Sequence, residues 1–436
     1  MRGVLAVVGC GVVLGLSAPV SAETPSPPPE AVRQFQQRQA ALPPGGVALQ
    51  LDLADWALDN GLLFQAEQLY RLVLARDPLN PRAYEALLRA ADERPLPRRS
   101  KAYDDARSHL PPRFTEYQTK RFIVLSDAES TWTRRQAQRL ERTYHQFHRF
   151  TRRLDLRPLP LKHKLVCILF KDRDAYRGFA RTHDDVTDFW IAGYYAPMHD
   201  RVVFYRGDAN PSVVKARGQL DEMRADIASL DREAHQAERE GRHDWADVLR
   251  QHGQRYRRHV KQETRRVDQF AEQVSTATTV HETVHQLSFH TGIQSPRCQY
   301  PLWLSEGLAT AFETDSTGHA FGPDHEYAPR REMFEQLLRE DGLIDLAELV
   351  TWASIPDGGD ELVHGAYQQF YALMTWMSRF RTQELRCFLE SMLIHPVRSP
   401  DSTRYRQLFE QAFGDIDRLE AAWLRYERSR LADSLP

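Results

Sequence analysis

The chain has 436 residues, of which 42% are hydrophobic, and this is enough to bury the cores of two or three domains. Its 58 basic and 60 acidic residues leave a formal net charge of -2. Because this balance lacks the positive field with which proteins attract nucleic acid, DNA and RNA are excluded as expected partners.

Residues 1–22 have the pattern of a secretory signal peptide. An apolar run from Val4 to Leu16 follows a single arginine, and Val20-Ser21-Ala22 provides small residues at the cleavage site. The run is too short to span a membrane, so we expect an exported mature chain, periplasmic or extracellular, without an integral membrane segment. The rival interpretation is a lipoprotein signal acylated at Cys10, which the continuation of the apolar run past Cys10 disfavours.

Two segments precede the main folded region. Residues 23–46 are rich in proline and end with two glycines, a composition typical of an exposed linker. Residues 47–112 predict a helical unit, because small residues, an aromatic residue and a proline have the spacing of one tetratricopeptide-like repeat. These residues are Ala57, Gly61, Ala66, Tyr70 and Pro78. An isolated repeat rarely presents a concave surface, so structural support is favoured over partner recruitment.

The next segment predicts a small mixed sheet. Residues 120–125 and 165–170 are short apolar runs of the kind found in strands, and a helical pattern lies between them, from about Thr131 to Leu154. Residues 191–205 predict a β-hairpin with its turn at 197–200. One strand of this hairpin is either an open sheet edge that binds an extended peptide or an ordinary core strand.

Residues 212–295 contain no proline, and the pattern over about 212–277 predicts an inserted helical hairpin. Apolar residues recur every three or four positions from Leu220 to Ala237, as in the seam of a coiled coil, and Gly241 then interrupts the pattern. The second helix should lead into, or pack beside, the segment that begins at Val280. Aromatic residues at helical spacing near the C-terminus predict a closing helical subdomain.

Cleavage of the signal would leave three cysteines, which are too few for a disulfide framework. They are Cys167, Cys298 and Cys387. Either Cys298 and Cys387 form one bridge, or all three are unpaired and packed as small hydrophobic residues.

The chemistry is concentrated at His281-Glu282-Thr283-Val284-His285. On a helix, two histidines four positions apart project from one face and can reach a single metal ion. Glu282 lies beside them, placed to take a proton from a water molecule at that ion. With Glu306 the site has three protein ligands and an open position, as catalytic zinc sites do, whereas structural zinc sites use four ligands.

These motifs resemble the gluzincin zinc metallopeptidases, the clan of thermolysin and the zinc aminopeptidases. The second motif is Trp303-x-x-Glu306-Gly307-x-Ala309, and residues 286–305 separate its glutamate from His285. The chain is also similar to a group of secreted bacterial proteins in which a helical part precedes a peptidase-like domain. The resemblance runs from about Thr119 to the C-terminus. It implies a predominantly helical α+β fold, with a small mixed sheet and an active-site helix in residues 113–436.

The resemblance also implies roles for single residues. His281, His285 and Glu306 would bind zinc, and Glu282 would act as the general base. Tyr367, expected just before an apolar helix, would donate a hydrogen bond to the oxyanion, with His364 as a substitute donor. A core tyrosine is the alternative for Tyr367.

Two departures from related patterns limit the assignment. Metzincin chemistry is excluded, because Thr291 stands where that group has its third histidine, and His290 is expected to be a packed or capping residue. Thr310 stands where thermolysin has an aspartate that supports a ligand histidine. Glu313 and Asp315 are both candidates for that supporting role.

The sequence therefore predicts a secreted, zinc-dependent metallopeptidase that hydrolyses a peptide or protein substrate. The alternative is an envelope scaffold, or partner-binding protein, whose zinc site is structural or vestigial. In that case the helical regions would bind a protein partner.

Overall fold

The computed structural model describes residues 28–43, 46–92, 95–187, 192–354, 356 and 359–433. The predicted signal peptide and Cys10 lie outside these residues. The predicted class is confirmed, because the chain is predominantly helical with one small mixed sheet. Contacts between residues divide it into two compact units, residues 1–72 and 73–436.

The first unit contains a helix that composition did not predict. Helix α1 (Pro29–Ala40) lies inside the segment expected to be a linker, so the prediction of a linker over 23–46 is wrong for these residues. The prolines gather before the helix and at its first position, where a missing N–H is tolerated, and none follows before Pro43. Helix α2 (Val47–Asp59) follows, and α3 (Leu63–Leu74) begins after Gly61, whose φ is 73°.

The boundary between the units differs from the predicted one at residue 112. Helices α4 (Pro81–Asp92) and α5 (Lys101–His109) both belong to the second unit. Helix α5 buries Ala102, Tyr103 and Ala106 in the same apolar cluster as the strands of the sheet. An amphipathic helix belongs to the unit whose core buries its apolar face. The apolar face of α5 is buried against the sheet, so α5 belongs to the second unit.

The sheet has five strands in the order β1-β2-β3-β5-β4. The bounds are β1 (Thr115–Gln118), β2 (Phe122–Ser126), β3 (Leu165–Phe170), β4 (Gly193–Ala196) and β5 (Arg201–Tyr205). The three central strands β2, β3 and β5 are parallel, and the two outer strands β1 and β4 are antiparallel to their neighbours. The predicted hairpin is confirmed as β4 and β5, and β4 is the edge strand of the order.

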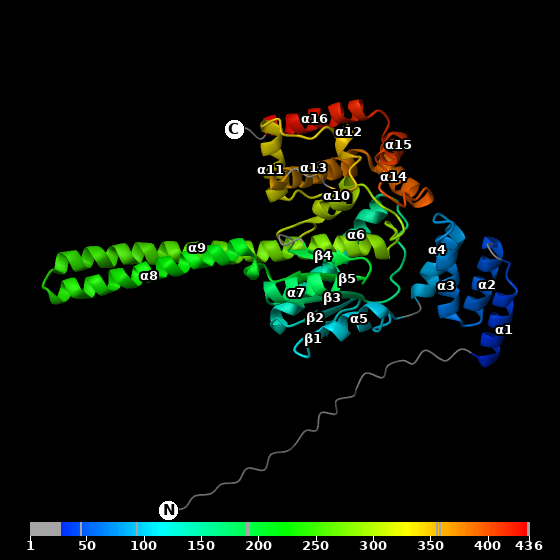
Figure 1. Cartoon of the computed structure of the whole chain (residues 1–436), viewed down its shortest axis with the longest axis horizontal. Helices are drawn as coiled ribbons and strands as arrows, with labels where there is room; N and C mark the ends of the chain where they lie inside the picture. Colours follow the sequence, from blue (N-terminus) through cyan, green and yellow to red (C-terminus); the bar gives the residue numbers. More distant parts are fainter. Residues whose placement is uncertain are drawn as a thin grey trace, which may run out of the picture. The chain divides into compact units, whose positions relative to one another are not determined.

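Helices cover both faces of the sheet (Figure 1). Alternate residues of each central strand point to opposite faces, so Phe122 and Val124 belong to one core and Ile123 and Leu125 to the other. The first core packs against α6 (Ser130–Arg153) and α9 (His243–His290). The second core packs against α5 and α7 (Arg173–His183).

The predicted helical hairpin consists of α8 (Pro211–Arg239) and α9, which extend together away from the sheet (Figure 1). Four residues of α8 recur every seven positions and are buried: Val213, Leu220, Ile227 and Ala234. The hairpin turns at Gly241, whose φ of 77° suits glycine. Helix α9 has 48 residues and continues without a break past the predicted end of the insertion to His290.

The remaining helices form the C-terminal part of the second unit. They are α10 (Leu302–Phe312), α11 (Ala328–Arg339), α12 (Leu346–Leu349), α13 (Gly359–Phe380), α14 (Thr382–Ile394), α15 (Ser402–Phe413) and α16 (Ile416–Asp433). Of the two alternatives for the cysteines, the bridge is not formed, because all three are free. Cys167 and Cys298 are buried as the other alternative expects, but Cys387 is exposed. Within the described ranges, every helix is too short or too polar to cross a bilayer.

Candidate metal centre

Helix α9 carries His281, Glu282 and His285 close together in one stretch of about a turn. Contacts on either side hold the helix in place, since Val284 and Gln286 are both buried and Val284 belongs to the core. The side-chain amide of Gln286 donates a hydrogen bond to a backbone carbonyl of β3, at 3.2 Å. Because both contacts fix the rotation of α9 about its axis, the two histidines are directed to a set position.

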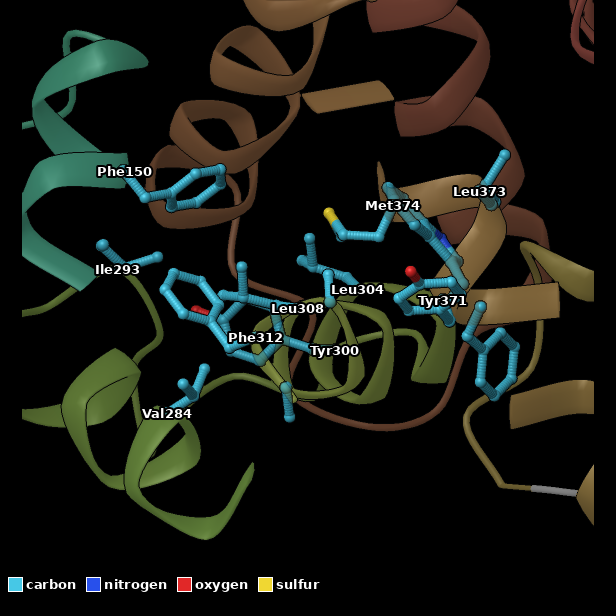
Figure 2. Close-up of a cluster of buried hydrophobic side chains, with 14 of the residues drawn as sticks. Phe150, Val284, Ile293, Tyr300, Leu304, Leu308, Phe312, Tyr371, Leu373 and Met374 are labelled. Carbon is cyan, nitrogen blue, oxygen red and sulfur yellow. The ribbon is translucent and has the colours of Figure 1, made fainter. Parts of the chain in front are cut away.

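Helix α10 brings Glu306 to the same place. Trp303 anchors this helix, because it is fully buried and packs at an angle against aromatic rings of α14 and α15. Gly307 allows the close approach of α13, since a Cβ at this position would lie 3.0 Å from the backbone oxygen of Phe370. The core behind the site is shown in Figure 2, where Val284 of α9 and Phe312 of α10 lie near each other.

The three predicted ligands converge on one point. The Nε2 atoms of His281 and His285 are 3.2 Å apart. Glu306 presents one oxygen to each of them, at 3.3 Å from His281 Nε2 and 3.5 Å from His285 Nε2. In a tetrahedral zinc site with bonds of about 2.0–2.1 Å, neighbouring ligand atoms are about 3.3 Å apart. The distances between the three side chains are close to those between the ligands of such a site.

Glu313 contacts the first predicted ligand. His281 Nδ1 lies 2.9 Å from Glu313 Oε1, so the other ring nitrogen, Nε2, is the one that could bind a metal. Arg330 of α11 holds the same carboxylate at both oxygens, with distances of 2.7 Å and 2.8 Å. Of the two candidates for this role, Glu313 is the one in contact, whereas Asp315 is exposed. The hydroxyl of Thr310 donates to the carbonyl of Glu306 in its own helix.

The ionisation of these groups is set by burial and by their mutual contacts. Burial opposes charge on His281, but hydrogen bonds to Glu306 and Glu313 outweigh it and raise the pKa of His281 to about 10. Burial also opposes charge on Glu313, yet Arg330 lowers the pKa of Glu313 to about 2. Burial raises the pKa of Glu282, because the neighbouring histidines do not offset it as Arg330 does at Glu313.

The charges of the site favour a divalent cation. Three carboxylates, from Glu282, Glu306 and Glu313, face one guanidinium, from Arg330, so two negative charges are in excess. Without a metal, a proton on His281, whose pKa is raised to about 10, offsets part of this excess. A divalent ion would supply two positive charges and release that proton.

The edge strand β4 runs directly beside Glu282. A Cβ on Gly193 would lie 3.2 Å from Glu282 Cγ and 2.8 Å from the side chains of Thr278 and Phe204. Only glycine fits at this position without movement of the helix or the strand. The backbone of the outer strand is therefore brought against the turn of α9 that carries Glu282.

Tyr367 lies at the site, but not where the sequence placed it. The sequence predicted Tyr367 just before a helix, whereas α13 begins at Gly359 and contains Tyr367. The helix can start earlier because Gly365 is the only helix-breaking residue between Asp360 and Phe380. Burial, the charge of Glu306 and a hydrogen bond with Glu306 raise the pKa of Tyr367 well above its ordinary value. Its hydroxyl therefore keeps its proton and remains a donor.

Other candidates do not reach this centre. His364 is exposed on α13. His290 lies at the end of α9, where its Nε2 is 2.5 Å from Asp200 Oδ1. Arg330 was missed by sequence reasoning, because it has no fixed spacing from the ligands and reaches Glu313 from a separate helix.

Residues 275–397 match the family DUF1570, which is described as a protein of unknown function. No curated protein matches the chain. The matched segment includes the three predicted ligands, Glu282, Glu313, Arg330 and Tyr367, and it begins after the last strand of the sheet.

Proposed function

We propose that this chain is an exported zinc-dependent metallopeptidase of gluzincin type. The observation that carries the proposal is the spacing of His281 Nε2, His285 Nε2 and the Glu306 carboxylate, 3.2–3.5 Å from one another. Three protein ligands leave one position open, which is the arrangement of catalytic and not structural zinc sites. The Glu313 contact behind His281 adds the support that ligand histidines ordinarily have.

Glu282 is the proposed general base. Zinc bound by the three ligands would supply a Lewis acid for a water molecule and for the carbonyl of the substrate. Burial raises the pKa of Glu282, which makes its carboxylate a stronger base toward the proton of that water. The same carboxyl group can then deliver the proton to the leaving amine of the peptide.

Tyr367 is the proposed oxyanion donor. Its hydroxyl contacts Glu306, the third ligand, and its raised pKa keeps it protonated. A neutral O–H group fixed beside the site can donate to the charge that develops on the carbonyl oxygen. Arg330 lies near the face of the Tyr367 ring, at 5.9 Å from its centroid, within range of a cation–π contact.

Strand β4 is the proposed binding edge for the substrate. It is the last strand in the order of the sheet, and Gly193 brings it against Glu282. An extended peptide can add to such an edge through backbone hydrogen bonds, which recognise a main chain and not one particular sequence. The proposed substrate is therefore an extended peptide or an unfolded segment of a protein.

The test compares zinc content and peptide cleavage in the same preparations. Glu282→Gln should keep its zinc and lose at least about 100-fold in cleavage rate, and Tyr367→Phe should lose about 100-fold. Asp315→Asn, an exposed acidic residue close to Glu313, is the control and should be unchanged. If zinc-loaded protein cleaves nothing in a broad peptide library, while His281→Ala lowers thermal stability, the scaffold alternative is supported instead.

A further inference from the structure

A second group of metal-binding side chains lies at the C-terminal end of α9. His290 is the last residue of α9, Asp200 ends the turn between β4 and β5, and His163 precedes β3. One donor atom from each of the three residues lies within 4.8 Å of the other two. We propose that His163, Asp200 and His290 bind a second divalent transition-metal ion of the zinc type, distinct from the ion of the metal centre.

The Asp200 carboxylate lies between the two imidazoles. Its Oδ1 is 2.5 Å from His290 Nε2, and its Oδ2 is 3.6 Å from His163 Nε2. The two imidazole rings meet edge to face, with centroids 5.4 Å apart. Two imidazole nitrogens and one carboxylate oxygen are a donor set that suits zinc and other late first-row metals.

The tautomer of His163 favours a metal ligand. Its Nδ1 lies 3.1 Å from the backbone oxygen of Lys164, which can only accept a hydrogen bond, so the proton is assigned to Nδ1. The lone pair is then on Nε2, which faces Asp200 Oδ2 at 3.6 Å, beyond hydrogen-bond distance. A lone pair directed at a carboxylate oxygen is repelled unless a proton or a metal ion lies between them. A carbonyl behind the imidazole is also a common support of ligand histidines.

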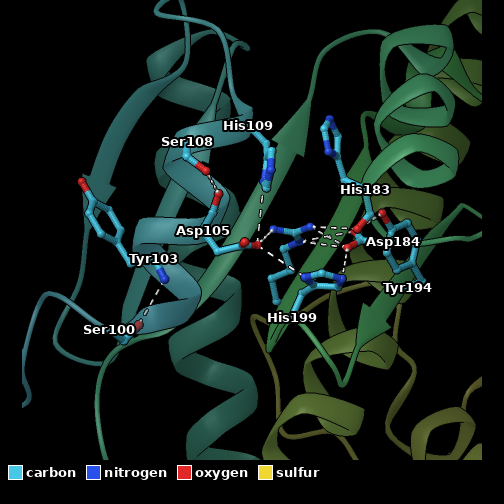
Figure 3. Close-up of polar contacts among 10 residues, drawn as sticks. Ser100, Tyr103, Asp105, Ser108, His109, His183, Asp184, Tyr194 and His199 are labelled. Carbon is cyan, nitrogen blue, oxygen red and sulfur yellow. Dashed lines mark hydrogen bonds and ion pairs between the residues drawn. The ribbon is translucent and has the colours of Figure 1, made fainter.

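The carboxylate of Asp200 is held in place by its neighbours in the chain. His199 and Arg201 point to the opposite side, where both contact Asp105 and Asp184, and Figure 3 shows His199 between these two carboxylates. Asp200 itself lies in the turn, and its Oδ1 also accepts a hydrogen bond from the Tyr195 hydroxyl, at 3.3 Å. Asp200 also has a positive φ of 53°, an uncommon conformation outside glycine that the flanking contacts maintain.

The second group cannot share the ion of the metal centre. His290 follows His285 by five residues, which places it about 8 Å further along α9 and about 140° around the helix. The proposed ion would join three segments: the end of α9, the turn of the β4–β5 hairpin and the loop before β3. It would thereby fix the hairpin whose outer strand passes Glu282, whether or not the chain is a peptidase.

Metal stoichiometry tests the proposal without any measurement of activity. Zinc is titrated into chelator-treated protein by calorimetry, and bound zinc is counted by elemental analysis. We expect two zinc ions per wild-type chain, one in His290→Ala and one in the double variant His281→Ala/His285→Ala. Adding His290→Ala to that double variant should leave none. His259→Ala, an exposed histidine of α9, is the matched control and should keep two.

A milder variant separates metal binding from simple hydrogen bonding. In Asp200→Asn the amide oxygen can still accept from His290, but the charge that favours a cation is gone. We expect at least about tenfold weaker zinc binding at the second site, with the native circular dichroism spectrum retained. The proposal is overturned if wild-type protein binds a single zinc ion, or if His290→Ala and Asp200→Asn leave the stoichiometry and affinity at the wild-type values.

Discussion

The Nδ1 of His281 and the Oε1 of Glu313 are 2.9 Å apart, and this contact joins the C-terminal part of α9 to the end of α10. Arg330 binds both oxygens of the same carboxylate, so the support comes from three helical segments at once. The orientation of His281, the first predicted ligand, therefore depends on residues that follow it by more than thirty positions.

Replacing this carboxylate should weaken metal binding. In Glu313→Gln the charge that faces His281 and Arg330 is lost, and we expect zinc affinity to fall about 10-fold to 100-fold. Competition with a chromophoric chelator would measure the affinity. Asp315→Asn, in the same segment but exposed, should bind zinc like wild type. Equal affinities for the two variants would show that Glu313 does not orient the ligand.

Zinc affinity should rise with pH. Burial opposes charge on His281, but its hydrogen bonds to Glu306 and Glu313 raise its pKa to about 10, so the metal-free site holds a proton at neutral pH. Zinc must displace that proton, and lower pH therefore weakens binding, by up to about tenfold per pH unit for each proton released. Calorimetry in buffers of different ionisation enthalpy would count the protons. Affinity that is constant between about pH 7 and pH 9 would contradict this assignment.

The same pKa has a consequence for the stability of the metal-free protein. The pKa of His281 is higher in the folded chain than in the unfolded chain. The stability that protonated His281 contributes is therefore fully present below about pH 6.5, and it is lost as the pH rises toward about 10. Thermal melting of chelator-treated protein should therefore show lower stability at the alkaline end of this range. His281→Gln should remove that part of the pH dependence.

A methyl group at Gly307 should destabilise the chain. Its Cβ would lie 3.0 Å from the backbone oxygen of Phe370, which α13 holds in place, so Gly307→Ala should cost about 1–3 kcal/mol. The control is Gly218→Ala in α8, where a Cβ meets nothing within 4 Å. There alanine should stabilise the helix by about 0.5–1 kcal/mol. Denaturant unfolding would compare the two, and a stabilising Gly307→Ala would show that α10 and α13 separate easily.

The buried guanidinium of Arg201 should matter more than a surface arginine. It contacts Asp184 at 2.6 Å and Asp105 at 2.7 Å, and its side chain is fully buried. Arg201→Met would leave the buried Asp184 without its guanidinium partner and should cost about 3–5 kcal/mol. Arg224→Met breaks an exposed pair with Asp221 and should cost less than about 1 kcal/mol. Similar unfolding midpoints for the two variants would refute the distinction.

Local periodicity predicted most of the elements around the site. The spacing of His281 and His285 depends only on helical geometry, and the structure brings Glu306 to them as expected. The same kind of local pattern predicted the helical hairpin of α8 and α9 and the positions of the strands β2 and β3. Composition was a weaker guide, since the prolines before α1 mark the start of a helix and not a continuous linker.

Contacts between distant segments could not be predicted in this way. Arg330 reaches Glu313 from another helix, and the position of α5 against the sheet depends on which core covers its apolar face. His163, Asp200 and His290 come together only because β3 and β5 are neighbours and α9 crosses the sheet beside them. The distance between these three residues depends on the order of the strands in the sheet. The spacing of residues along the sequence therefore could not predict it.

The unbroken course of α9 constrains how the length of the hairpin can vary. One helix of 48 residues carries both the seam that packs on α8 and the face that bears His281 and His285. A single inserted residue would turn these two surfaces by about 100° relative to each other. Length can therefore change only by heptads that are matched in α8 and α9, and the reach of the hairpin varies in steps of about 10 Å.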